Sequence, residues 1–175
     1  MEPTIVDRLH SEFTVLVQHL STASETSLVI TADECFRKAL LLTAASLFET
    51  EIVTVIQQFV SDCTAGNDRV VEFVKRRTLK RQYHTLFDWD ESHARPFFAL
   101  FGAEFKSAMD ARAKSDVTFV SSVAAFMELG RERNRLVHQN FGHFTLEKTA
   151  DEIYELYRNA AAFVGELPAL LRTPL

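Results

Sequence analysis

Apolar residues recur at helical spacing along most of the chain. Ile5, Leu9, Phe13, Leu16 and Leu20 follow one another at steps of four and three, which places them on one face of an amphipathic helix. No run of alternating apolar and polar residues is longer than a few positions, so no β-strand is predicted. The pattern therefore predicts an all-α protein.

Five further helices follow in the pattern. The sequence TADE at residues 31–34 has the residue types of a capping box, and it predicts the start of a long second helix that runs to the TAGND turn at residues 64–68. A second TADE copy at residues 149–152 predicts the start of the last helix, which we expect to end near Pro168. The helices between them are predicted at residues 68–82, 97–105 and 117–138, with irregular chain at 83–96. We therefore predict a bundle of about five to six helices.

Length and composition suit one helical domain. At 175 residues the chain fits a single unit, which we expect to span residues 1–175, and its 15 Phe suit helices packed by aromatic side chains. Cys35 and Cys63 are too few for a disulfide scaffold and are expected to be reduced thiols buried in the core. We find no signal peptide and no apolar run that approaches the roughly 20 residues of a membrane span. A cytoplasmic protein without membrane contact is therefore expected.

Charge is distributed unevenly along the chain. The net charge of -5 argues against a general electrostatic attraction to nucleic acid, but the predicted helix at residues 68–82 is a basic block. This block could contact the phosphates of RNA, although a run of this kind is more often a solvated helix face. Its candidates for backbone contact are Lys75, Arg76, Arg77, Lys80 and Arg81.

The six histidines and two cysteines do not form a metal-binding pattern. The sequence contains no CxxC, HxH or HExxH pair, and its five glycines include neither GxGxxG nor GxxxxGK. We therefore expect no metal ion and no cofactor, so that any chemistry must come from the side chains of the protein.

The most informative stretch is RNRLVH, residues 133–138, at the end of the predicted helix 117–138. In a helix, Asn134 and His138 lie one turn apart on one face, and the long side chain of Arg133 could converge with the imidazole on one phosphate. Arg131 has the same reach, because it lies almost in line with His138. Arginine presents a fixed fork of donors to phosphate oxygens, and histidine gives and takes protons near neutral pH.

Such a set is sufficient for RNA cleavage without a metal ion. A base removes the proton from a ribose 2′-OH, which attacks the adjacent phosphate, while an arginine stabilises the charge on the non-bridging oxygens. The alternative is a solvated helix end, in which the arginines and His138 only interact favourably with the negative end of the helix dipole. Spacing alone leaves both interpretations open.

RNRLVH resembles the R-polar-x-x-x-H motif of the HEPN superfamily. AASLFETEI at residues 44–52 and TLEKTADEIYELYRNAAAFV at residues 145–164 are similar to its RiboL-PSP-HEPN subgroup. The resemblance implies a HEPN-like helical bundle in which Arg133, Asn134 and His138 are the motif residues. It also leaves Arg131 as a second candidate for the arginine, and it implies that Glu49 is a further polar group of the cleft.

Many HEPN proteins are metal-independent endoribonucleases in toxin-antitoxin systems or antiviral defence, and they dimerise so that two motifs face one cleft. The resemblance therefore implies an RNA substrate, fragments with 2′,3′-cyclic phosphate ends and a homodimer with a composite cleft. It further implies an antitoxin or inhibitor protein as a partner.

Several alternatives remain open at this level. A HEPN module without activity would bind a nucleotide or a partner protein through the same cleft, and a helical adaptor would use the arginines only as a helix end. Glu49 would then pair with an arginine or face solvent. Tyr83, Trp89 and His93 in the irregular segment would either stack on unpaired bases or pack against the bundle.

Overall fold

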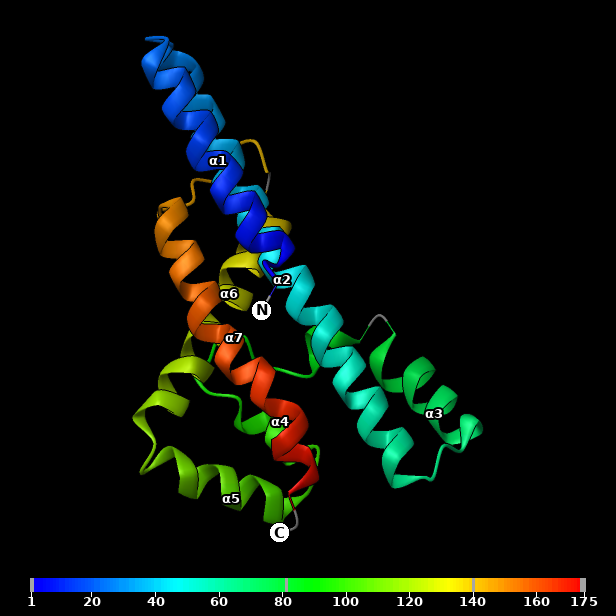
Figure 1. The fold of residues 1–175 in the computed structure, drawn as a ribbon. Coiled ribbons are helices and arrows are strands. Elements are labelled where there is room, and N and C mark those ends of the chain that lie inside the picture. Colours follow the sequence, from blue (N-terminus) through cyan, green and yellow to red (C-terminus); the bar gives the residue numbers. More distant parts are fainter. Residues whose placement is uncertain (1, 81, 140, 174–175) are drawn as a thin grey trace.

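The computed structural model describes residues 2–80, 82–139 and 141–173, which form a bundle of helices (Figure 1). The α-helices are α1 (Ile5–Thr22), α2 (Thr26–Cys63), α3 (Asp68–Val74), α4 (Arg95–Ala99), α5 (Ala103–Ala113), α6 (Val117–His138) and α7 (Ala150–Arg172). A π-helical turn, η1 (Lys75–Leu79), continues α3, and a 3-10 turn, η2 (Tyr83–Thr85), follows it. The all-α prediction is confirmed, since these described residues contain no strand.

The three longest helices enclose an aromatic core. Helix α7 packs against both α6 and α2, and α1 folds back along the first half of α2 (Figure 1). The largest fully buried side chains are Phe48 from α2, Phe97 from α4, Phe126 from α6 and Phe163 from α7. Phe126 meets Phe163 edge to face with 5.3 Å between ring centroids, a geometry in which aromatic rings attract each other beyond the effect of their buried area. This core fixes α6 against its neighbours.

The two TADE sequences adopt different structures. At residues 149–152 the predicted capping box is confirmed, because Thr149 and Glu152 each accept a hydrogen bond from the backbone N–H of the other. At residues 31–34 the prediction is wrong, because α2 already begins at Thr26. The Thr31 hydroxyl lies inside that helix and donates to the Ser27 carbonyl at 3.2 Å.

Three further expectations are corrected by the structure. Gly102 has a φ of 106°, which disfavours a side chain, and it divides the predicted helix 97–105 into α4 and α5. Helix α7 continues past Pro168, because Leu170 and Leu171 in its last turn are buried. Cys35 and Cys63 are free thiols as predicted, but both are exposed because α2 turns these positions away from the core.

Helix α2 is the one described helix that is long and apolar enough in composition to cross a membrane. The sequence-based expectation that no apolar run reaches this length was therefore wrong. Length and composition do not by themselves distinguish a membrane span from a core helix. In this fold the apolar side chains of Leu40, Leu41, Phe48 and Ile52 on α2 are buried in the core of the bundle.

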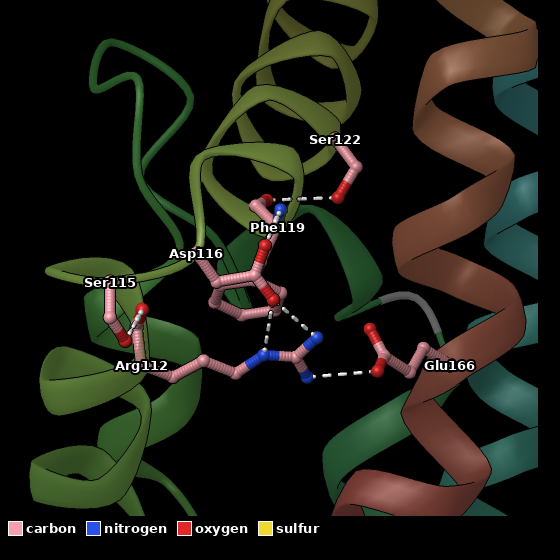
Figure 2. A network of polar contacts seen from close by, with 6 residues as sticks. All are labelled: Arg112, Ser115, Asp116, Phe119, Ser122 and Glu166. Carbon is pink, nitrogen blue, oxygen red and sulfur yellow. Dashed lines mark hydrogen bonds and ion pairs between the residues drawn. The ribbon is translucent and has the colours of Figure 1, made fainter.

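A polar network joins α5, α6 and α7 (Figure 2). Arg112 donates hydrogen bonds from Nε and Nη2 to Asp116 at 3.0 and 2.9 Å, and its Nη1 forms an ion pair with Glu166 at 2.9 Å. Asp116 also caps α6 by accepting the Phe119 N–H. Partial burial acts to lower the pKa of Arg112, but its contacts with Glu166 and Asp116 outweigh this effect and raise the pKa. Arg112 is therefore a charged structural link with two carboxylate partners.

Candidate active site

Helix α6 carries the RNRLVH sequence on its last turns. The helix remains α-helical through His138 and ends there, since the next residue, Gln139, has an extended backbone. Leu129 and Leu136 are buried on the core face of this helix. The helical spacing assumed from the sequence therefore holds, and it puts Asn134 and His138 one turn apart.

One pocket brings the predicted site residues together. Arg133, Asn134 and His138 from α6 line an open space of about 710 Å³ together with Glu49 from α2. The remaining walls are Val137, Tyr83, His84 and Trp89. We call this space the motif pocket. A narrow inner recess, with a cavity volume of about 20 Å³, shares most of these walls and extends toward Phe48 and Phe126 of the core.

Arg133 is free to bind an anion in this pocket. Its Nη1 donates to the Asn134 side-chain oxygen at 3.1 Å, and it forms no ion pair with a described carboxylate. Burial raises the pKa of the Tyr83 phenol far above its ordinary value of 10.0; the Glu49 carboxylate adds to this rise, and Arg133 opposes it. The Tyr83 side chain therefore lines the pocket as a neutral hydroxyl together with the charged Glu49 and Arg133.

Arg131 lies on the other side of the motif. It borders a wider groove of about 1190 Å³ together with Asn134 and His138, opposite Asp88 and Asp90. We call this space the Arg131 groove. Asn134 and His138 thus border both spaces, whereas Arg133 and Glu49 line only the motif pocket. Asp88 and Asp90 oppose the positive charge of Arg131 in this groove, as Glu49 opposes that of Arg133 in the motif pocket, so the assignment of the motif arginine to Arg133 stays a prediction.

The acidic residues near the motif are paired with bases. Glu132 forms an ion pair with Arg135 at 2.9 Å, and Glu128 forms one with Lys148 at 2.6 Å. Their charges are partly neutralised. These ion pairs reduce the electrostatic repulsion that Glu128 and Glu132 would exert on an RNA backbone at the motif end of α6.

A glycine on α6 allows one wall of the pocket to form. A Cβ atom built on Gly130 would overlap the six-membered ring of Trp89, so only glycine admits the indole at this distance. Trp89 also donates from Nε1 to the His84 carbonyl at 2.9 Å and packs against Phe87 with 4.9 Å between ring centroids. This contact holds segment 83–89 against the helix that carries the motif.

The three residues considered for base stacking have different environments. Tyr83 is only 9% exposed and packs against Trp89, which is half-buried. Packing is therefore a role of both rings, although both also line the motif pocket. His93 does not line this pocket and lies 3.6 Å from the Glu91 carboxylate.

The basic block does not line the motif pocket. Lys75, Arg76 and Arg77 lie in η1 and are exposed, and Glu72 pairs with Arg76 at 2.9 Å and with Lys75 at 3.5 Å. Lys80 is exposed, and Arg81 lies outside the described residues. Contact of this block with RNA stays a prediction.

His84 is the pocket residue that the sequence analysis missed. It lies in the irregular segment, where no periodicity indicates which side chains face a neighbouring helix. Tertiary contacts of its segment, among them the contact between Trp89 and Gly130, bring it to the motif. The side chains around the pocket do not include a metal centre, and no cluster of three or more His, Cys, Asp or Glu suited to a metal ion occurs in the described ranges.

Comparison with known proteins identifies the family. A family model described as RiboL-PSP-HEPN matches residues 7–171, which is nearly the whole chain. No curated protein and no solved structure matches the chain. HEPN domains are commonly nucleases, and others are nucleotide-binding modules. The chain belongs to the RiboL-PSP-HEPN family.

Proposed function

We propose that this protein is a metal-independent endoribonuclease that cleaves RNA by attack of a ribose 2′-OH on the adjacent phosphate. The observation that carries this proposal is the motif pocket. Arg133, Asn134 and His138 line one open space, and the guanidinium in it is not neutralised by a described carboxylate. A phosphate is the ligand that this combination of donors fits best.

In this mechanism His138 takes part in proton transfer and Arg133 stabilises the transition state. The 2′-oxygen forms a bond to phosphorus as its proton leaves, the bond to the 5′-oxygen breaks, and that oxygen takes up a proton. The products have a 2′,3′-cyclic phosphate and a 5′-hydroxyl. Arg133 would bind the non-bridging oxygens, where negative charge accumulates, and Asn134 would hold Arg133 or the phosphate in place.

Glu49 would be an accessory residue. Its carboxylate faces the pocket without an ion pair to Arg133, so it is available to orient an imidazole or a ribose hydroxyl. Arg131 would contact a phosphate that flanks the cut, from the Arg131 groove. The exposed Lys75, Arg76, Arg77 and Lys80, together with Arg81, would bind the RNA backbone further away.

A homodimer with a composite cleft is part of this proposal. Val137 lines the motif pocket next to His138 and is 45% exposed, so the pocket carries apolar surface that a second copy would cover. A role in toxin-antitoxin or antiviral defence, with an antitoxin or inhibitor as partner, follows from the family resemblance and is proposed with it. A cytoplasmic location stays a prediction from the sequence.

A second candidate function is a HEPN module without activity that binds a nucleotide or a partner protein. The same residues of the motif pocket support this alternative, since Arg133 and Asn134 could hold the phosphate of a nucleotide without cutting a bond. The two functions predict different products. A binding module would retain RNA or nucleotide in the pocket without cutting it.

The test is incubation of the wild type and His138→Ala with a mixed RNA pool in EDTA, followed by analysis of the fragment ends. We expect cyclic phosphate ends with the wild type and intact RNA with the variant. His138 is exposed at a helix end, so thermal unfolding of the variant should be unchanged. Intact RNA with a folded, dimeric and inhibitor-free wild type would refute the nuclease and favour the binding module.

A further inference from the structure

A second histidine faces the motif pocket. His84 lines both the pocket and its inner recess, where Arg133, Asn134 and Glu49 are also found. It comes from η2 rather than from α6, so it approaches the pocket from a wall different from that of His138. Two histidines of one protomer, His84 and His138, therefore line the space in which a phosphate would meet Arg133.

The backbone of His84 is fixed while its side chain is exposed. Its carbonyl accepts the Trp89 Nε1–H at 2.9 Å, and its neighbour Tyr83 is buried against Phe87 and Trp89. The imidazole itself has no hydrogen bond or ion pair within the described part of the chain. His10 is different, because it bonds to Asp151 at 2.9 Å and stacks on Tyr154. His84 is thus held in place but has no structural contact of its own.

Transesterification of RNA needs two proton transfers. One group takes the proton of the 2′-OH, and another gives a proton to the departing 5′-oxygen, so a single imidazole cannot do both in one step. We propose that His84 is the second proton-transfer residue and works with His138 of the same protomer. This proposal rests on the endoribonuclease function proposed above.

The step is balanced without any further reactant. One imidazole accepts the 2′-OH proton as the bond between the 2′-oxygen and phosphorus forms. The bond between phosphorus and the 5′-oxygen breaks, its electron pair stays on that oxygen, and the other imidazolium protonates it. The net result is a cyclic phosphate, a 5′-hydroxyl and one proton moved between two histidines, which solvent returns.

The test compares His84→Ala and His138→Ala with a control variant, His19→Ala. His19 lies on α1 outside the pocket, and its side chain is exposed and has no partner among the described residues. Each protein is given two RNA substrates cut at the same site, one natural and one with sulfur in place of the 5′-bridging oxygen. A thiolate leaves without a general acid, so loss of the acid is rescued by sulfur and loss of the base is not.

We expect His84→Ala to cut the natural substrate slower by a factor on the order of 10²–10³, with unchanged thermal unfolding and an unchanged His19→Ala control. The sulfur-substituted RNA should restore the cleavage rate of one of the two pocket variants. The histidine missing from that variant is then the general acid. Each variant should also lose a different limb of a bell-shaped pH–rate profile. These limbs would not change if His84 only supported the fold.

Two results would overturn the proposal. One is His84→Ala activity within about threefold of the wild type, since general acid–base catalysis contributes far more than this. The other is a loss of cleavage that the sulfur-substituted RNA restores in neither His84→Ala nor His138→Ala. Both leave the endoribonuclease itself intact, because that function is judged by wild-type cleavage and by its dependence on His138.

Discussion

Arg112 and Arg133 are both half-buried arginines beside the aromatic core, but their polar surroundings differ. Arg112 is held by the carboxylates of Asp116 and Glu166, within 3.0 Å of each, and lies 4.3 Å from the centre of the Phe119 ring (Figure 2). Arg133 has one described hydrogen-bond partner, the neutral side chain of Asn134, and faces an open pocket. The first arginine joins three helices, and the second has donors available for a ligand.

This difference shows why an arginine near a helix end cannot be assigned from its position alone. A guanidinium with two carboxylate partners has its charge balanced inside the protein. A guanidinium without them retains a positive potential that attracts an anion, and Glu49 does not cancel it by direct contact. The comparison predicts that changes at Arg133 affect cleavage and that changes at Arg112 affect stability.

The largest expected effect is on catalysis. Arg133→Gln should reduce the cleavage rate by a factor on the order of 10²–10³, because it removes the charge that stabilises the transition state. Arg131→Gln should cost about tenfold or less, because a flanking phosphate contact mainly affects binding. The measurement is kcat and KM for both variants on one RNA. A larger loss of cleavage rate in Arg131→Gln than in Arg133→Gln would assign transition-state stabilisation to Arg131.

The next effect concerns the wall of the pocket. Gly130→Ala should displace Trp89 and destabilise the protein by about 1–3 kcal/mol, because the new methyl group overlaps the indole. The same change at Gly165 meets no neighbouring atom and should stabilise α7 by roughly 0.5–1 kcal/mol. Denaturant unfolding gives both values, and the fluorescence of Trp89, the only Trp, should shift in the Gly130 variant alone. An unshifted spectrum there would contradict the contact.

A smaller effect is expected at Arg112. Arg112→Gln should cost about 1 kcal/mol, since its ion pairs are partly exposed, and should lower Tm by about 2–4 °C. Cleavage per folded molecule should not change. Arg8→Gln is the matched control, because Arg8 is exposed and takes no ion pair with the described residues. A loss of cleavage in folded Arg112→Gln would contradict the assignment of Arg112 to stability and of Arg133 to cleavage.

The smallest effect is the response of the same network to acid. The hydrogen bond from the Phe119 backbone, followed by the contact with Arg112, holds the pKa of Asp116 below its ordinary value of 3.8. This carboxylate therefore stabilises the fold above pH 3.8, and the contribution is lost as pH falls through the lowered pKa. Asp116→Asn keeps a capping side chain without the charge.

The measurement is Tm against pH for the wild type and Asp116→Asn. The wild type should be more stable near neutral pH, and the two curves should converge below pH 3.8. Parallel curves over this range would show that the charge of Asp116 does not contribute. The motif residues should not enter this dependence, since none of them contacts the network.

The sequence predicted what depends on helical spacing. Arg133, Asn134 and His138 could be placed because they lie on one helix, and the helix is local structure that periodicity reveals. Glu49 could be singled out because it interrupts an apolar stretch of α2. The pocket that joins Glu49 to the motif follows from the packing of α2 against α6, which one helical pattern does not specify.

The remaining features depend on contacts between distant segments. Gly130 leaves room for the indole of Trp89 beside the motif helix, and no local signal in residues 83–96 indicates this contact. The first TADE sequence failed as a helix start because α2 already begins at Thr26, so residues 31–34 lie inside the helix. The same four residues cap α7, so an identical local sequence is not sufficient to predict a helix start.

The most direct test of the central claim uses one mapped RNA substrate in EDTA, with the ribose on the 5′ side of the cut replaced by deoxyribose. The account predicts that the wild type binds both RNAs with similar affinity, cuts the all-ribose RNA to a 2′,3′-cyclic phosphate and leaves the substituted RNA intact. Cleavage of the substituted RNA at the same position would contradict the account, because the nucleophile would then not be the 2′-OH that the motif pocket is proposed to activate.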